Sequence, residues 1–119
     1  MMQKIEEIKA LVVAALEDLK AVNLQVIDVR GKTTVADYMV IASGTSNRHV
    51  KSLANNVIVE SKKAGVMPFG IEGDKTGEWV LVDMGDVIVH VMQQQTRDFY
   101  QLEKLWEIHA AESVASANG

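Results

Sequence analysis

The sequence predicts a single α/β domain with a mixed β-sheet flanked by helices. Segments with the apolar spacing of amphipathic helices alternate with segments rich in β-branched residues. The stretch from Trp79 to Met92 has two such β-rich runs around a glycine, which is typical of a hairpin. Because this hairpin follows a strand–helix crossover, parallel and antiparallel pairings are expected in one sheet.

Length and composition indicate one globular domain. A chain of 119 residues can bury roughly two-thirds of its unfolded surface. The absence of cysteine excludes a disulfide framework, a thiolate metal site and a thiol nucleophile. No apolar stretch approaches the roughly 18 residues needed to span a bilayer, and the N-terminus lacks the features of a signal peptide. We therefore expect a soluble cytoplasmic protein.

The charge balance favours a protein partner over nucleic acid. Sixteen acidic against twelve basic residues give a formal net charge of −4. Such a chain lacks the basic surface from which duplex-binding proteins gain most of their affinity. Docking on a basic protein that itself sits on nucleic acid remains open.

Each element is predicted by its local pattern. Apolar residues at helical spacing predict an amphipathic helix over residues 3–20. The run Tyr38–Ala42 is almost continuously apolar, as in a central strand buried on both faces. Proline is poorly tolerated in central strands, so Pro68–Gly73 is expected at the periphery. The remaining expected elements are a strand over Val22–Arg30, a turn over Gly31–Thr34, a second helix from Thr45 or Ser46 as N-cap to Gly65 as C-cap, and a last helix with Thr96 as N-cap that carries Phe99, Leu102, Leu105 and Trp106 on one side. The domain is assigned to residues 1–109, with a frayed tail over 110–119.

The hairpin sorts its side chains into two faces. With Met84 and Gly85 as the turn, Trp79 would lie opposite His90. The valine face comprises Val80, Val82, Val87, Val89 and Val91, and we expect it to be core. The mixed face comprises Trp79, Leu81, Asp83, Asp86, Ile88, His90 and Met92. This second face is either ordinary core covered by the following helix or a functional surface.

No pattern predicts catalysis or metal binding. The histidines, His49, His90 and His109, are not at a recognised metal-ligand spacing. Asp83 and Asp86 flank the turn, where solvated acids are commoner than Mg²⁺ ligands. The turn Ser43–Asn47 lacks the full glycine-rich phosphate-binding fingerprints, so a capped turn is favoured over an anion site. We expect no enzyme, no cofactor and no metal.

Several motifs, in order and spacing from about residue 24 to 108, resemble one known family. They are Ala36–Val50 (ADYMVIASGTSNRHV), Ile71–Gly73 (IEG), Gly77–Asp83 (GEWVLVD), Val89–Val91 (VHV) and Arg97–Trp106 (RDFYQLEKLW). In these segments the chain resembles the ribosomal silencing factors, also called Iojap-like proteins. Met92 stands where the family usually has an aromatic residue, and Met84 stands where it frequently has a tyrosine. The methionine at position 92 affects the shape of the contact that the resemblance implies.

The resemblance implies a function in translation. Members bind the large ribosomal subunit through its protein number fourteen, on the face that meets the small subunit. They block subunit joining and lower translation when nutrients are scarce. Their fold is related to nucleotidyltransferases without the catalytic pattern. A large-subunit biogenesis factor and a nucleotide- or RNA-binding module are the alternatives, and a homodimer stays open.

With this family in view, the mixed face becomes the expected contact with the ribosomal protein. Aromatic and methionine side chains anchor interfaces, and acids complement a basic partner. The expected contact residues are Trp79, Leu81, His90 and Met92, with Tyr100 beside them and Glu72, Asp83 and Asp98 as the charged rim. Glu72 and Asp83 would alternatively serve only to maintain turns.

Overall fold

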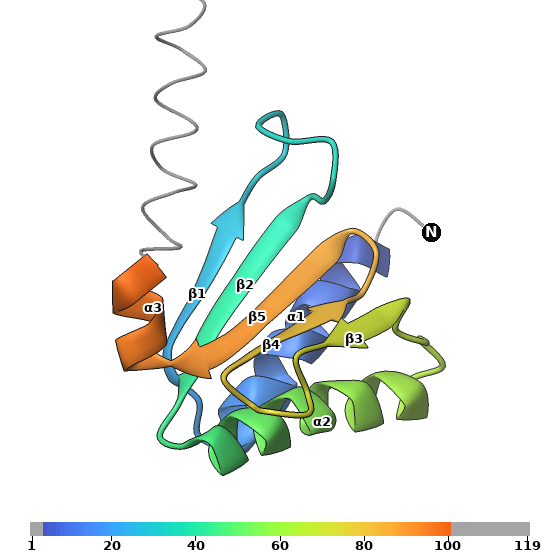
Figure 1. Cartoon of the computed structure of the whole chain (residues 1–119). Helices are drawn as coiled ribbons and strands as arrows, with labels where there is room; N and C mark the ends of the chain where they lie inside the picture. The colour runs from blue at the N-terminus through green and yellow to red at the C-terminus, as the bar shows by residue number, and fades with distance from the viewer. Residues whose placement is uncertain (1–3, 101–119) are drawn as a thin grey trace, which may run out of the picture.

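The computed structural model of the chain describes residues 4–100 and shows a five-stranded mixed sheet, as the sequence predicts (Figure 1). The strand order is β1-β2-β5-β4-β3; β2 and β5 are parallel, and the other neighbours are antiparallel. The elements are α1 (Lys4–Asp18), β1 (Val22–Asp28), β2 (Tyr38–Gly44), α2 (Asn47–Lys63), β3 (Gly70–Glu72), β4 (Trp79–Asp83), β5 (Val87–Gln93) and α3 (Gln94–Tyr100). None of the helices in this part of the chain is long and apolar enough to cross a membrane.

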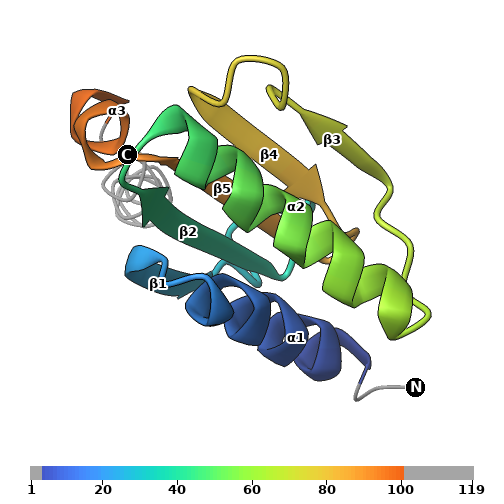
Figure 2. The same ribbon diagram turned by 90° about the horizontal axis from the view of Figure 1, so that it is seen from below.

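The two long helices cover one face of the sheet. In Figure 2, α1 and α2 lie side by side across the strands, and α2 contacts β2, β4 and β5. On the opposite face the short helix α3 packs at the end of β2 and β5, and it is the only helix there within residues 4–100 (Figure 1). The two faces of the sheet therefore have different surroundings.

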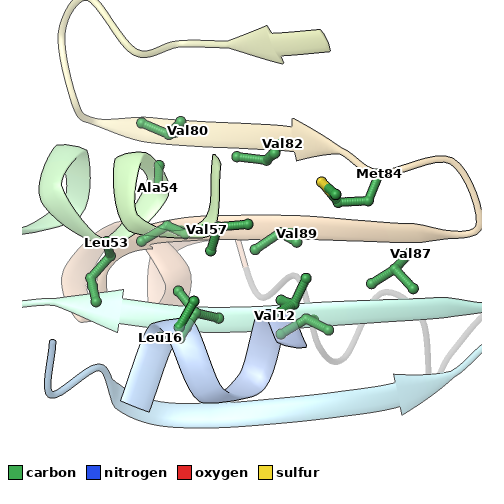
Figure 3. Packing of buried hydrophobic residues seen from close by; sticks show 14 of the residues in the cluster. Val12, Leu16, Leu53, Ala54, Val57, Val80, Val82, Met84, Val87 and Val89 are labelled. Carbon is green, nitrogen blue, oxygen red and sulfur yellow. The ribbon is translucent and has the colours of Figure 1, made fainter. Parts of the chain in front are cut away.

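The valine face of the hairpin forms the main core, which confirms the prediction. Its five valines are fully buried beneath α1 and α2. Figure 3 shows Val12 and Leu16 of α1 and Leu53 and Val57 of α2 packed around them. Every residue of the central strand β2 is buried too, as its continuous apolar run predicts.

The turn between β2 and α2 is a capped turn. The Ser46 hydroxyl accepts a hydrogen bond from the His49 amide at 3.0 Å, and the His49 ring Nδ1 accepts from the Thr45 amide at 2.9 Å. These bonds use amide donors that an anion would otherwise need. At the other end, Ala64 is the C-cap, one residue before the predicted Gly65, which follows it with a positive φ of 79°.

Ser46→Ala is expected to lower the free energy of unfolding by about 1 kcal/mol, because the His49 amide loses its acceptor. Urea titration measures the loss. Ser52→Ala is the matched control, since Ser52 is exposed on the same helix and its side chain makes no hydrogen bond within residues 4–100. Equal stability of the two variants would contradict the capping role.

Two further local predictions are wrong. The hairpin turn consists of Gly85 and Asp86, because the Met84 amide bonds the Val87 carbonyl at 3.0 Å. The cross-strand pairs therefore shift by two residues, which preserves both faces. Thr96 is not an N-cap: β5 ends at Gln93 and α3 begins at Gln94 with no intervening loop.

Candidate functional site

The mixed face carries a second, smaller apolar cluster. Its buried members are Val29, Ala36, Met39, Ile41, Ile88 and Met92. Ile27, Trp79 and Leu81 pack against it and are partly exposed. The mixed face is thus core at its centre and partly accessible at Trp79 and Leu81.

Trp79 is held in place by two neighbours. Its indole Nε1 donates a hydrogen bond to His90 Nδ1 at 3.0 Å. The Tyr100 ring lies on it with centroids 5.1 Å apart. The register places Trp79 opposite Met92, so His90 lies diagonally across from it and not directly opposite as predicted.

Gly73 allows the backbone of Trp79, the first residue of β4, to lie close to the backbone of residue 73. It has a φ of 81°, and a Cβ there would collide with the Trp79 carbonyl oxygen. Glycine adopts this conformation without strain. The IEG segment at the end of β3 is therefore part of what positions Trp79.

His90 is a buried, neutral acceptor. It is 7% exposed, and burial lowers its pKa to about 4. The hydrogen bond from Trp79 requires Nδ1 to be unprotonated, which agrees with the lowered pKa. His90 therefore orients the indole.

The predicted contact residues divide by accessibility. Met92 is fully buried and His90 nearly so, and they are the cross-strand partners of Trp79 and Leu81, respectively. Tyr100 is 55% exposed. Trp79, Leu81 and Tyr100 therefore provide the accessible part of the set.

The three predicted rim acids differ in their surroundings. Glu72 is exposed on the edge strand β3, and Asp98 is exposed on α3. The Asp83 carboxylate accepts from the Gly85 amide at 2.8 Å, so it does stabilise a turn, as the alternative interpretation has it. Asp98 accepts from the Gln94 side chain at 2.7 Å.

Arg97 is the functional candidate that the residue-level reasoning missed. It is 2% exposed, and its guanidinium donates to the Ser43 hydroxyl at 2.8 Å. Ser43 in turn donates to Gln94 Oε1, which also accepts from Asn23. This network, buried at Arg97 and exposed at Asn23, fastens α3 to β2 and β1. The sequence predicted a break at residues 93–96, whereas α3 begins at Gln94. The inward position of Arg97 on that helix was therefore not predicted.

The described residues hold no cluster of three or more His, Cys, Asp or Glu side chains that could bind a metal ion. The site instead presents apolar and aromatic side chains with acids at its margin. Such an arrangement is suited to docking on a protein.

Comparison with known proteins gives one consistent result. A family model described as "Ribosomal silencing factor during starvation" matches residues 2–118. The chain is 50% identical over 91 residues to ribosomal silencing factor RsfS of Haemophilus influenzae, covering 76% of this chain and 89% of the relative. It is also 50% identical over 103 residues to RsfS of Chromobacterium violaceum, covering 87% and 84% of the two chains. A crystal structure of a Chromobacterium violaceum protein, also 50% identical, superposes with a TM-score of 0.85 over 87% of this chain and 86% of that one.

Proposed function

Because the chain belongs to the ribosomal silencing factor family, we propose that it binds the large ribosomal subunit and blocks joining with the small one. The contact is with the subunit's protein number fourteen, and its consequence is repression of translation when nutrients are limiting. The observation that carries the proposal is the indole of Trp79, fixed by His90 and Tyr100 on the side of the sheet opposite the long helices.

The fixed indole suits an interface anchor. Ordering a side chain during association costs free energy, and here His90 and Tyr100 have ordered Trp79 in advance. Leu81 lies on the same face and adds apolar area beside the indole. His90 and Met92, on the neighbouring strand β5, contribute by supporting these two side chains.

The acids at the margin support a basic partner. The ion pairs formed within residues 4–100 are Lys9–Glu6, Arg30–Asp28 and Lys63–Glu60. Glu72, Asp83 and Asp98 take part in none of these. Unpaired carboxylates around an apolar centre complement a positively charged protein surface and speed its association.

Trp79→Ala is expected to weaken binding to isolated large subunits about thirty-fold, since interface anchors of this kind are worth about 2 kcal/mol or more. Affinity and melting temperature are measured on the same preparations. Phe69→Ala is the matched control, because Phe69 is an exposed aromatic near the opposite end of β4 and is expected to retain wild-type binding.

The paired measurement separates an interface role from a core role. A near-native melt with lost binding supports the proposed contact. A melt far below wild type would identify Trp79 as core, and unchanged binding would show that the contact lies elsewhere.

Cosedimentation tests the function as a whole. The protein is expected to travel with isolated large subunits and to lose this association once subunits are joined. Comigration with small subunits alone would refute the proposal.

A further inference from the structure

A groove between the start of β4 and α3 is not explained by the packing of the fold. It has a volume of about 490 Å³ and is lined by Glu78, Gln95, Thr96, Asp98, Phe99 and Tyr100. We call it the α3 groove. It adjoins the proposed contact, because the Tyr100 ring that forms part of its wall also lies on Trp79.

The α3 groove is negatively charged and has no basic side chain in its lining. Glu78 and Asp98 are both exposed, and neither forms an ion pair with any residue from 4 to 100. The adjacent Arg97 does not neutralise them from within the groove, since its side chain is buried and its guanidinium bonds Ser43.

Two aromatic rings face the same groove. Phe99 is 78% exposed and Tyr100 is 55% exposed. The two rings meet edge to face at 88°, with centroids 4.9 Å apart. Rings that face solvent add little to the stability of the fold, but their faces attract cations.

The chain already combines these groups elsewhere, with a cation in place. At Tyr38, the Lys9 ammonium lies 4.3 Å from the ring centroid and the Arg30 guanidinium lies 5.1 Å from it. Glu6 bonds Lys9 and Asp28 bonds Arg30. The α3 groove has the ring and the carboxylates of this arrangement, and none of its lining residues supplies the cation.

We propose that the α3 groove receives an arginine or lysine side chain of the protein partner, held between the carboxylates of Glu78 and Asp98 and the rings of Phe99 and Tyr100. This inference rests on the proposed function for the identity of the partner. It adds a specificity element to the contact at Trp79, because a neutral side chain in the same place would leave both carboxylates unpaired.

The first test uses isolated large subunits. The double variant Glu78→Gln/Asp98→Asn is expected to bind about tenfold more weakly and with a smaller dependence on salt. Its matched control is Glu17→Gln/Asp18→Asn, which removes the same charge from exposed positions of α1 and is expected to bind as wild type. Phe99→Leu keeps an apolar side chain without a π face and is expected to lose about threefold.

The second test needs no ribosome. An acetylated and amidated Gly-Arg-Gly-Arg-Gly peptide is titrated into the protein, with the citrulline peptide as the neutral counterpart. The arginine peptide is expected to shift the amide NMR signals of Glu78 and Asp98–Tyr100 at millimolar concentration. The citrulline peptide is expected to leave them unchanged, and so is the arginine peptide in the double variant.

The two tests separate the inference from the proposed function. Wild-type binding to large subunits with an unaffected double variant would overturn the groove proposal alone. A groove response to the arginine peptide without large-subunit binding would overturn the proposed function alone. A response that the citrulline peptide reproduces would refute the groove proposal.

Discussion

Val89→Asp is expected to prevent folding. Val89 lies in the middle of β5, paired with Val40 on one side and Val82 on the other, and all three side chains are fully buried. A carboxylate placed there has no partner and no water. Its burial costs several kcal/mol, which is a large part of the stability of a small domain.

Circular dichroism with urea titration checks this result. Val26→Asp is the matched control, because Val26 is 40% exposed on the edge strand β1 and its replacement should leave a cooperative transition. A native-like transition for Val89→Asp would show that the valine face is not the core of the domain.

His90 is expected to make the fold less stable in acid. Its pKa is about 4 in the folded protein and about 6.5 when exposed on unfolding. Below pH 6.5 the unfolded chain therefore binds a proton that the folded chain excludes. The free energy of unfolding should fall as the pH drops from 6.5 to 4 and then level off for this group, by about 3 kcal/mol in total.

Urea titrations across this pH range measure the effect, and His90→Gln isolates it. The glutamine amide can still accept from Trp79 Nε1 but does not titrate. The free energy of unfolding of the wild type, relative to that of the variant, should therefore fall toward acid pH. An NMR titration of the His90 ring in folded protein with a midpoint near 6.5 would contradict the prediction.

The sequence was informative wherever one periodicity dominated. Alternation along residues 79–92 assigned Val80 and Val89 to the core, and that assignment survived an error in the turn because the true register differs by an even number of residues. The turn itself was misplaced because both Met84-Gly85 and Gly85-Asp86 bring a glycine to a two-residue turn, and cross-strand bonds decide between them.

The candidate site was less predictable because it depends on contacts between distant segments. The spacing of the strand residues did not show that His90 and Met92 are buried while Trp79 is partly exposed. A buried Arg97 contradicts the usual exposure of arginine, and one of its partners, the Ser43 hydroxyl, lies more than fifty positions earlier in the chain.

The direct junction between Gln93 and Gln94 restricts how the length of this protein can vary. One inserted residue would turn α3 by about 100° relative to β5, which would carry Arg97 away from Ser43 and Tyr100 away from Trp79. Residues 30–35, in the connection between β1 and β2, are exposed or partly exposed and can absorb such a change. Insertions and deletions among related sequences should therefore accumulate in that connection and be rare at the junction, where a single inserted residue would disrupt the proposed contact surface while leaving the valine core intact.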